Sequence, residues 1–371
     1  MDFNYVVLPA LIVLAGISIA GLAMRRMVSP RLKSRSAWRR AAERVLLSSL
    51  TVLVLAAAAS SAFNAIMLHR DLAHPPGEFY RVNGHRMRID CMGSGSPTLV
   101  LDAALGNSGL DWSAVQPELA KTTRVCSYDR AGFGWSDALP PPRDADHIAS
   151  ELHGLLAAAK IEGPIVLMGH SLAGIYIRDY ATRYPADVAG LVFVDASTPA
   201  QNQDPAVKAH GLMRRPPLPQ ILLIKTGFIL GIPRLAGACS NKTPGLDAYT
   251  SKLRSEDRCH QEFQGPAEME SFDRSSEETV HTGPYGALPV LIFSHDPAKS
   301  DEPADLAQAW EKWQEDLNAL STRSRRIIAR SSGHYIQIDR PDLVEKEVTF
   351  FIEQIRGTAP QPEDYGSTKT E

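Results

Sequence analysis

The chain has 371 residues, of which 44% are hydrophobic and 22% charged, and its formal net charge is −3. This length can bury a large core, as one big domain or two small ones. Nine of the 39 basic and two of the 42 acidic residues precede residue 71, so the remaining 30 basic and 40 acidic residues make the body net acidic. An acidic body argues against nucleic acid as a partner.

Two uncharged apolar runs near the amino end, about residues 5–24 and 45–68, are each long enough to cross a membrane. About 20 residues at 1.5 Å per residue span a hydrocarbon core of about 30 Å. Residues 25–44 between them carry eight basic residues and one acid, and basic connecting loops stay on the cytoplasmic side. We therefore expect residues 1–70 to form a two-pass hairpin that leaves the body extracytoplasmic, periplasmic or extracellular. A signal peptide for the first run and a buried or amphipathic helix for the second are the alternatives.

The four cysteines show neither a Cys-x-x-Cys motif nor zinc-ligand spacing. An even number of cysteines in an extracytoplasmic domain favours disulfides. Cys91 and Cys126 fall at or near predicted strands, whereas Cys239 and Cys259 share one irregular segment. We expect the pairs 91–126 and 239–259, with four free, buried thiols as the alternative for a cytoplasmic body.

The body begins at residue 79, after a Pro- and Gly-containing linker at 71–78, with alternating residues around Asn83-Gly84 that predict a hairpin. Apolar strands then alternate with helical segments, which is typical of a parallel sheet covered on both faces. The predicted strands are 98–101, 123–128, 164–168, 190–195, 288–293 and 326–329, and the predicted helices are 144–160, 172–184, 303–320 and 339–355, the last with Asp339 as N-cap.

This alternation is interrupted between about residues 198 and 286, where Pro, Gly, Gln and charged residues mix with short apolar stretches. An insertion of this length in a regular α/β series predicts a cap or lid subdomain. The α/β domain itself then covers residues 79–356. The tail at 357–371 is polar and rich in Pro, Thr and Glu, so we expect it to be disordered.

Residues 166–174, Val-Leu-Met-Gly-His-Ser-Leu-Ala-Gly, join a predicted strand to a predicted helix. A serine on such a sharp turn projects its hydroxyl into a cleft at the carboxyl end of the sheet, and small neighbours permit the tight bend. In the usual Gly-x-Ser-x-Gly pattern the second glycine is here Ala173, with Gly174 after it. Ser171 is therefore a candidate nucleophile, to be weighed against a chance match.

Four strings in order resemble the α/β-hydrolase superfamily, close to its esterase-like members with a helical cap. They are Tyr-Asp-Arg-Ala-Gly-Phe-Gly-Trp-Ser at 128–136, Gly-His-Ser-Leu-Ala-Gly at 169–174, Leu-Val-Phe-Val-Asp-Ala-Ser at 191–197 and Ser-Gly-His-Tyr-Ile-Gln-Ile-Asp-Arg-Pro at 332–341. The resemblance covers about residues 79–355. It implies an α/β-hydrolase fold with a mostly parallel eight-stranded sheet, helices on both faces and a helical cap.

In this family the triad order is Ser, acid, His. His334 follows the last strand and precedes the last helix, which is the family's position for the general base. Two aspartates compete for the acid: Asp195, one strand after the nucleophile and slightly favoured, and Asp296, after the next strand in the commoner family position. Asp301 is a weaker third candidate.

The oxyanion of an acyl transfer needs backbone donors. We expect the N–H groups of Leu172 and of Ala104, or of its neighbour Leu105, to supply them, although the family's His-Gly pair is absent from Asp102-Ala103-Ala104. His170 is interpreted as structural. Asp129, Arg130 and the glycines after them are also interpreted as a structural turn beside the cleft, with a contact to substrate as the alternative.

Together these features predict a membrane-anchored serine hydrolase that cleaves carboxylic esters through an acyl-enzyme on Ser171, with an apolar small-molecule ester as substrate. The same triad acting on amides, peptides or carbon–carbon bonds is one alternative, and a non-catalytic binding or sensor protein is another. No metal-ligand cluster and no nucleotide-binding loop is visible, so no cofactor is implied.

Overall fold

The computed structural model describes residues 8–28, 36–71, 75–211, 216–240, 246, 248–260, 265–300, 302–362 and 365–371. The chain divides into two compact units. The hairpin unit comprises Met1–Pro75, Pro217–Lys242 and Ser255–His260, and the sheet unit comprises Pro76–Pro216, Thr243–Arg254 and Gln261–Glu371.

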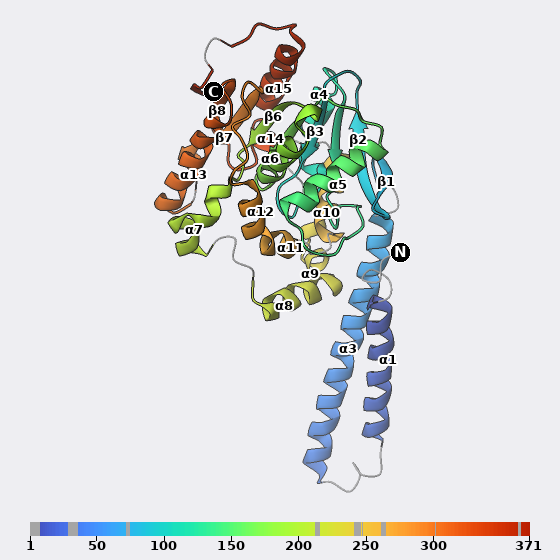
Figure 1. Ribbon diagram of the computed structural model, residues 1–371. Helices are drawn as coiled ribbons and strands as arrows, with labels where there is room; N and C mark the ends of the chain where they lie inside the picture. Colours follow the sequence, from blue (N-terminus) through green and yellow to red (C-terminus); the bar gives the residue numbers. More distant parts are fainter. Residues whose placement is uncertain are drawn as a thin grey trace. The chain divides into compact units, whose positions relative to one another are not determined.

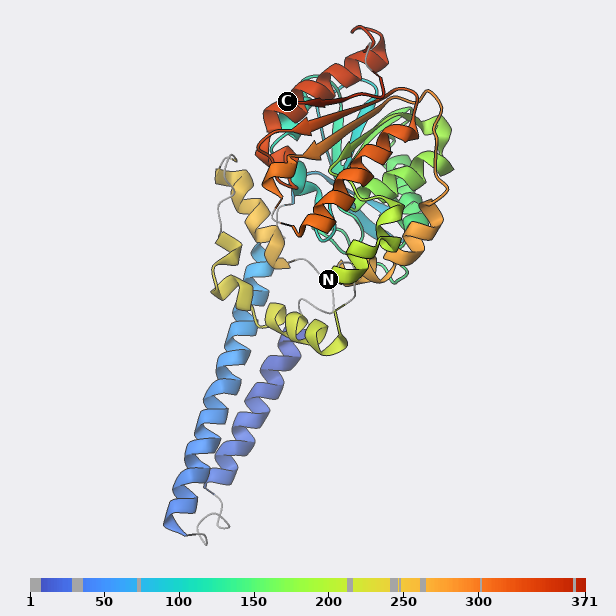
Figure 2. The same ribbon diagram turned by 90° about the vertical axis from the view of Figure 1, so that its left-hand side faces the viewer.

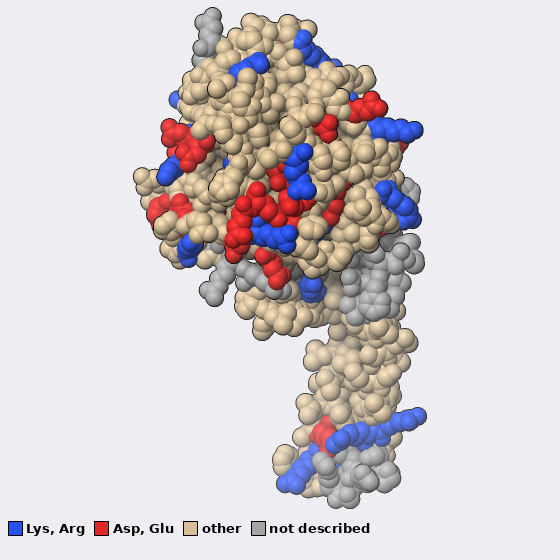
Figure 3. All heavy atoms as spheres, in the orientation of Figure 1, with Lys and Arg blue, Asp and Glu red and all other residues tan. Residues whose placement is uncertain are grey.

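Two long helices, α1 (Leu8–Met27) and α3 (Ala37–Asp71), run side by side in the hairpin unit (Figure 1). By length and composition, both are able to cross a membrane. Helix α3 begins eight residues before the predicted apolar run because Ala37-Trp-Arg-Arg-Ala-Ala-Glu43 consists largely of good helix formers. Residues 5–7 of the first predicted run lie outside the described residues. On the face shown in Figure 3, Lys and Arg side chains gather at the end of the α1–α3 pair where the chain turns. The middle of the helix pair shows no Lys or Arg side chain on this face.

The sheet unit contains a nine-stranded sheet in the order β1-β2-β4-β3-β5-β6-β7-β8-β9. Strands β1, β2 and β4 pair antiparallel, and the pairs from β4–β3 to β8–β9 are parallel. The strands are β1 (Glu78–Val82), β2 (His85–Met92), β3 (Thr98–Asp102), β4 (Val125–Tyr128), β5 (Ile165–His170), β6 (Val188–Val194), β7 (Val290–His295), β8 (Ser324–Ala329) and β9 (Thr368–Thr370). The predicted mostly parallel sheet is therefore confirmed, with one strand more than expected.

Helices cover both faces of this sheet (Figure 2). They include α4 (Gln116–Leu119), α5 (Ala145–Ala158), α6 (Ala173–Arg183), α13 (Ala304–Asp316), α14 (Ile336–Asp339) and α15 (Pro341–Arg356). Successive residues of β5 alternate between two cores: Leu167 packs with α5 and α6, whereas Val166 and Met168 pack with α4 and α15. Burial on both faces explains why these strands read as continuous apolar runs.

The carboxyl-terminal tail, predicted to be disordered, instead ends in β9, which pairs with β8 from Arg326↔Thr368 to Ile328↔Thr370. Strand β8 would otherwise be an edge strand with unpaired backbone groups, which a further strand can satisfy. The Glu371 N–H donates to Ile328 O at 3.0 Å. The backbone hydrogen bonds to β8 thus order a segment whose polar composition had predicted disorder.

The beginning and end of the α/β domain also test two local expectations. Asn83 and Gly84 both have positive φ, 51° and 84°, as a two-residue hairpin turn requires, which confirms the hairpin. The predicted N-cap Asp339 is wrong: α15 begins at Pro341 with Arg340 as its N-cap. Proline is preferred at the first position of a helix, and Asp339 serves another purpose, described below.

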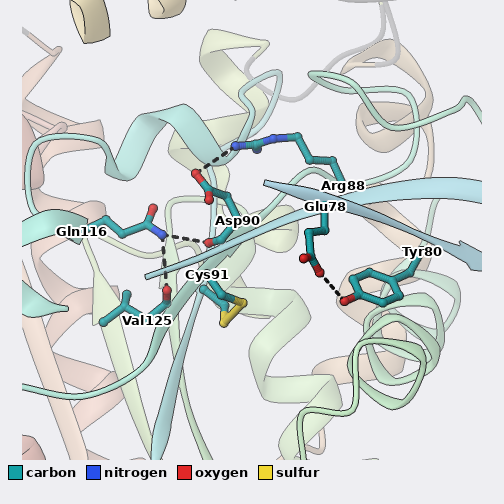
Figure 4. Close-up of a disulfide and its surroundings, with 8 residues drawn as sticks. Glu78, Tyr80, Arg88, Asp90, Cys91, Gln116 and Val125 are labelled. Carbon is teal, nitrogen blue, oxygen red and sulfur yellow. Dashed lines mark hydrogen bonds and ion pairs between the residues drawn. A yellow bond between two sulfur atoms is a disulfide. The ribbon is translucent and has the colours of Figure 1, made fainter. Parts of the chain in front are cut away.

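A disulfide joins Cys91 of β2 to Cys126 of β4, which are direct partners in the antiparallel ladder (Figure 4). Beside it, the Gln116 side-chain amide donates to Asp90 O at 2.8 Å and to Val125 O at 3.3 Å. The predicted pair 91–126 is thus confirmed. The side chain of Cys259, half of the second predicted pair, lies outside the described residues.

The insertion between β6 and β7 is helical, as predicted, and its elements are divided between the two units. Its elements are η4 (Pro199–Gln203), α7 (Pro205–His210), α8 (Leu218–Ile229), α9 (Ile232–Leu235), η5 (Ala238–Ser240), α10 (Ala248–His260), α11 (Gly265–Glu270) and α12 (Phe272–Thr279). Helices α8 and α9 belong to the hairpin unit, whereas α11 and α12 belong to the sheet unit.

Candidate active site

Four consecutive parallel strands, β5 to β8, bring the candidate residues to one edge of the sheet. Ser171 follows β5, Asp195 follows β6, Asp296 follows β7, and His334 lies in the loop after β8. Carboxyl ends of parallel strands meet at the same edge, which is where open α/β sheets bind ligands.

Ser171 lies on a strained turn between β5 and α6, with φ of +55°. A non-glycine residue in this left-handed region costs free energy, so surrounding structure must hold it there. The Ser171 N–H donates to Val194 O at 3.1 Å, and the Ser197 N–H donates to Ser171 O at 2.8 Å. Both bonds tie the nucleophile turn to the end of β6.

Packing around this turn explains its departure from Gly-x-Ser-x-Gly. A Cβ at Gly174 would lie 2.5 Å from the Ala196 Cβ and 3.0 Å from Ser197 O, and a Cβ at Gly169 would lie 2.9 Å from Ala173 O. Ala173, in contrast, is fully buried with its Cβ accommodated. The position that needs glycine on the helix side is therefore Gly174, because the backbone after Asp195 packs against it.

Asp195 and His334 are in direct contact: Asp195 Oδ2 lies 2.6 Å from His334 Nδ1. The Asp195 side chain is completely buried, whereas 38% of the His334 side chain is exposed. Asp195 also has a positive φ, +42°. In the part of the chain that the structure describes, no hydrogen bond joins the Ser171 hydroxyl to His334, a bond that often tightens only when substrate is bound.

Two further side chains hold the Asp195 carboxylate, and the sequence interpretation missed both. His295 Nδ1 lies 2.9 Å from each Asp195 oxygen, and the Trp310 Nε1–H donates to Oδ1 at 3.0 Å. Burial alone would raise the pKa of Asp195, but the hydrogen bonds from His295 and His334 lower it below its usual range. The carboxylate is therefore kept ionised. The one available signal was that His295 directly precedes the other candidate acid.

Asp296 lies close to the histidine loop but does not contact the His334 ring. Its Oδ2 accepts the Ser331 N–H at 2.9 Å, and its Oδ1 accepts the Ala298 N–H at 3.0 Å. These backbone hydrogen bonds lower its pKa, although the carboxylate is exposed. The structure thus brings Asp195, and not Asp296, to the ring of His334. Asp301 lies outside the described residues.

The loop that carries His334 is fixed from two other sides as well. Asp339 Oδ2 accepts the Gly333 N–H at 2.8 Å, which is the role it has in place of capping α15. His170 Nε2 lies 2.8 Å from His334 O. The backbone on both sides of the candidate base is therefore hydrogen-bonded to side chains from other parts of the chain.

His170 is fully buried beneath this loop, in agreement with its structural interpretation. Its ring centroid is 4.7 Å from that of His334, and its Nδ1 lies 3.2 Å from Gln337 Nε2. Burial lowers the pKa of His170, and Asp111 opposes that shift. His170 thus supports the His334 backbone from below.

The two expected oxyanion donors have backbone N–H groups with no acceptor. Neither the Leu172 nor the Ala104 N–H donates a hydrogen bond among the described residues. The Ala104 loop is fixed by the buried Arg130, whose guanidinium donates to Ala103 O at 2.5 Å and to Ala104 O at 2.9 Å. Arg130 also pairs with Glu268 of α11 at 2.7 Å, so its structural interpretation includes a link to the cap.

Among the described residues, no group of His, Cys, Asp and Glu is arranged to hold a metal ion. The arrangement consists of a serine on a strained turn, a partly exposed histidine held by a buried carboxylate, and two backbone N–H groups without an acceptor in the described part of the chain. Such a set is able to activate a hydroxyl and to stabilise a developing oxyanion.

Curated relatives match part of the chain. An uncharacterized protein of Schizosaccharomyces pombe is 28% identical over 244 residues, which are 63% of this chain and 42% of that protein. An AB hydrolase superfamily protein of Gibberella zeae is 25% identical over 283 residues, 70% of this chain and 87% of that protein. The chain spans about two fifths of the length of the first two curated relatives that it matches.

Solved structures share the fold. An epoxide hydrolase from an endophytic Streptomyces has a TM-score of 0.59 at 17% identity, covering 79% of this chain and 98% of that one. A thermophilic esterase from Thermogutta terrifontis has a TM-score of 0.52 at 20% identity, covering 76% of this chain and 99% of that one. The model of the family described as "Alpha/beta hydrolase family" matches residues 93–347. With this match, the fold and the geometry above, the chain belongs to the α/β-hydrolase family.

Proposed function

We propose that the protein is a serine hydrolase that cleaves carboxylic esters. Ser171 is the nucleophile, His334 the general base and acid, and Asp195 the group that orients His334. The observation that carries this proposal is the contact of 2.6 Å between the buried Asp195 carboxylate and His334 Nδ1, one strand away from the strained Ser171 turn. A carboxylate in this place fixes the tautomer that leaves Nε2 free to accept a proton.

The reaction follows from these roles. The Ser171 hydroxyl attacks the ester carbonyl carbon while His334 takes its proton, and the carbonyl oxygen becomes an oxyanion near the N–H groups of Leu172 and Ala104. Collapse expels the alcohol, which receives the proton from His334, and leaves an acyl group on Ser171. His334 then takes a proton from water, which attacks the acyl-enzyme; the bond between the acyl carbon and Ser171 Oγ breaks, His334 returns the proton to Oγ, and the carboxylic acid is released. No cofactor takes part in this scheme.

Labelling with a fluorophosphonate tests the nucleophile. Such a probe reacts covalently with an activated serine, so the wild type should be labelled and Ser171→Ala should not. Ser197→Ala is the matched control, because Ser197 is buried, lies two residues after Asp195, and its hydroxyl has no hydrogen-bond partner among the described residues. Labelling that persists in Ser171→Ala, or a wild type that is not labelled, would refute the proposal.

The proposal includes a membrane anchor. Helices α1 and α3 each have the length and apolar composition of a span, and the connection between them is basic, which favours a cytoplasmic loop and an extracytoplasmic catalytic domain. The substrate in this proposal is an apolar small-molecule ester, and nucleic acid is not a partner. A carboxyl-terminal fusion to a reporter that works only outside the cytoplasm should be active, and an inactive fusion would contradict this topology.

A further inference from the structure

Outside α1 and α3, the exposed large hydrophobic side chains of the described residues are concentrated in one place. Five of these nine side chains lie in α8 and α9. They form what we call the α8–α9 surface: Leu218, Leu222, Leu223, Ile232 and Leu235, with exposed fractions of 54% to 73%. Helices α8 and α9 contact each other, and protein surfaces in water seldom expose so many large apolar side chains on neighbouring helices unless they bind another apolar surface.

The α8–α9 segment is hydrogen-bonded to the polar residues of α3. Ser60 Oγ donates to Leu230 O at 2.5 Å, and Asn64 Nδ2 donates to Phe228 O at 2.8 Å. Gly231 approaches α3 so closely that a Cβ there would lie 2.8 Å from the Asn64 Cβ. These contacts fix the position of α8 and α9 along the axis of α3.

This position on the α3 axis lies within the apolar run of α3. Ser60 and Asn64 precede Leu68, the end of the apolar window, by eight and four residues. At 1.5 Å per residue, they lie about 6 to 12 Å inside the end of the span. Helices that lie in a membrane interface bury their apolar faces by about 5–10 Å. The depth of Ser60 and Asn64 along α3 is similar to this value.

We propose that the α8–α9 surface lies in the membrane interface and that the enzyme takes its ester substrate from the bilayer. This inference rests on the proposed membrane anchor and ester hydrolysis. A bilayer fits the surface better than a second copy of the chain does, because α3, to which the segment is bonded, itself exposes the apolar side chains of Phe63 and Ile66 at this position, 48% and 61%. The exposed Lys225 fits the same surroundings, since its long stem allows the ammonium to reach lipid headgroups.

The insertion connects this surface to the catalytic edge through the chain itself. It starts directly after β6, whose end carries Asp195, and its later helix α11 supplies Glu268 to the Arg130 ion pair beside the oxyanion loop. One continuous segment therefore contributes both the apolar surface and a residue that supports the site. This is the connection expected of a cap that receives apolar, long-chain esters.

Photo-crosslinking of the full chain in phosphatidylcholine–phosphatidylglycerol vesicles tests the location. Benzoylphenylalanine is placed at Leu223 on the α8–α9 surface, at Leu53 on α3, and at the exposed Lys121 of the sheet unit as the control. Lipid adducts at Leu53 and Leu223, and none at Lys121, are expected. Adducts at Leu53 alone, or protein–protein adducts at Leu223, overturn the inference and leave the anchor intact, whereas no adduct at Leu53 overturns the anchor too.

Kinetics test the route of the substrate. The double variant Leu222→Asp, Leu223→Asp should hydrolyse a long-chain ester dissolved in the vesicles about tenfold more slowly, since charge disfavours burial in lipid. Hydrolysis of water-soluble 4-nitrophenyl acetate and fluorophosphonate labelling should stay unchanged, which also shows that the variant is folded. Val280→Asp, the same change at a 54% exposed residue after α12, is the matched control and should alter neither rate. Equal losses on both esters, or no loss on the vesicle ester, overturn the inference; an inactive wild type refutes ester hydrolysis itself.

Discussion

The ends of strands β6 and β7 lie next to each other in the sheet, and each is followed by an aspartate, but the two carboxylates have different surroundings. Asp195, after β6, is fully buried and contacts His334, His295 and Trp310. Asp296, after β7, is partly exposed and, among the described residues, accepts backbone N–H groups of the turn and the neighbouring loop.

The contrast between the two aspartates shows that a position at a strand end does not by itself decide which carboxylate contacts His334. A buried carboxylate is costly unless hydrogen-bond donors surround it, and three side-chain donors converge on Asp195. Asp296 is partly exposed and is hydrogen-bonded to the loop backbone. In the proposed mechanism, Asp195 orients the base, whereas Asp296 shapes the loop that carries it.

The largest effect that would test this comparison is on turnover. Asp195→Asn should lower kcat about 10³- to 10⁴-fold, because the amide no longer favours the required tautomer or stabilises the imidazolium. Asp296→Asn should lower it by less than about tenfold, because Asn retains one oxygen acceptor for the loop. Steady-state kinetics on one soluble ester measure both variants.

Thermal unfolding of the two variants serves as the control for folding. If Asp296→Asn lost as much activity as Asp195→Asn while remaining folded, the division of roles between the two strand ends would be wrong. Equal, mild effects of both changes would remove Asp195 from the triad as well.

The backbone after Asp195 also packs on the nucleophile helix, and the second prediction concerns this contact. Gly174→Ala should destabilise the protein by about 1–3 kcal/mol, since its Cβ would meet the Ala196 Cβ at 2.5 Å. It should slow fluorophosphonate labelling too, because relief of the clash displaces the Asp195 turn. Ala173→Gly is the matched control and should leave labelling intact. Chemical denaturation that shows Gly174→Ala to be as stable as the wild type would contradict this.

Much of the fold follows from local patterns in the sequence. Three features depend on residues within about a dozen positions of one another: the Asn83-Gly84 hairpin, the alternation of buried strands and helices, and the Ser171 turn. Their patterns can therefore be recognised in the sequence alone. The order of motifs also placed His334 after β8. What the sequence left open was the acid, since Asp195 and Asp296 both follow strands.

The missed features depend on contacts between distant residues. Trp310 reaches Asp195 across 115 positions, and β9 exists because the backbone of β8 needs a partner. The association of α8 with α3 likewise depends on Ser60 and Asn64 meeting carbonyl groups more than 160 positions away. Neither periodicity nor composition predicts contacts between such distant residues. For His295, the one feature of the sequence that could have indicated its contact with Asp195 is its position next to Asp296.

His295 connects the two strand ends, because it belongs to β7 but binds the acid after β6. Burial alone would lower the pKa of His295, but the hydrogen bond and charge of Asp195 raise it above its ordinary value. We expect His295→Gln to lower kcat/KM about tenfold, or about 1.4 kcal/mol, as one donor and a positive charge are lost beside Asp195. The acidic limb of the pH profile should move to higher pH, because the unscreened Asp195 charge favours protonation of His334.

The same pair predicts how stability depends on pH. Since the folded-state pKa of His295 is raised, its ion pair with Asp195 stabilises the fold fully below the unfolded value of about 6.5 and loses that effect as the pH rises through the folded value. The excess stability of the wild type over His295→Gln should therefore be largest near pH 5 and shrink toward pH 9, as measured by denaturant unfolding. A difference that grew with pH, or a pH profile of kcat/KM that did not move, would mean that His295 only fills space beside the acid.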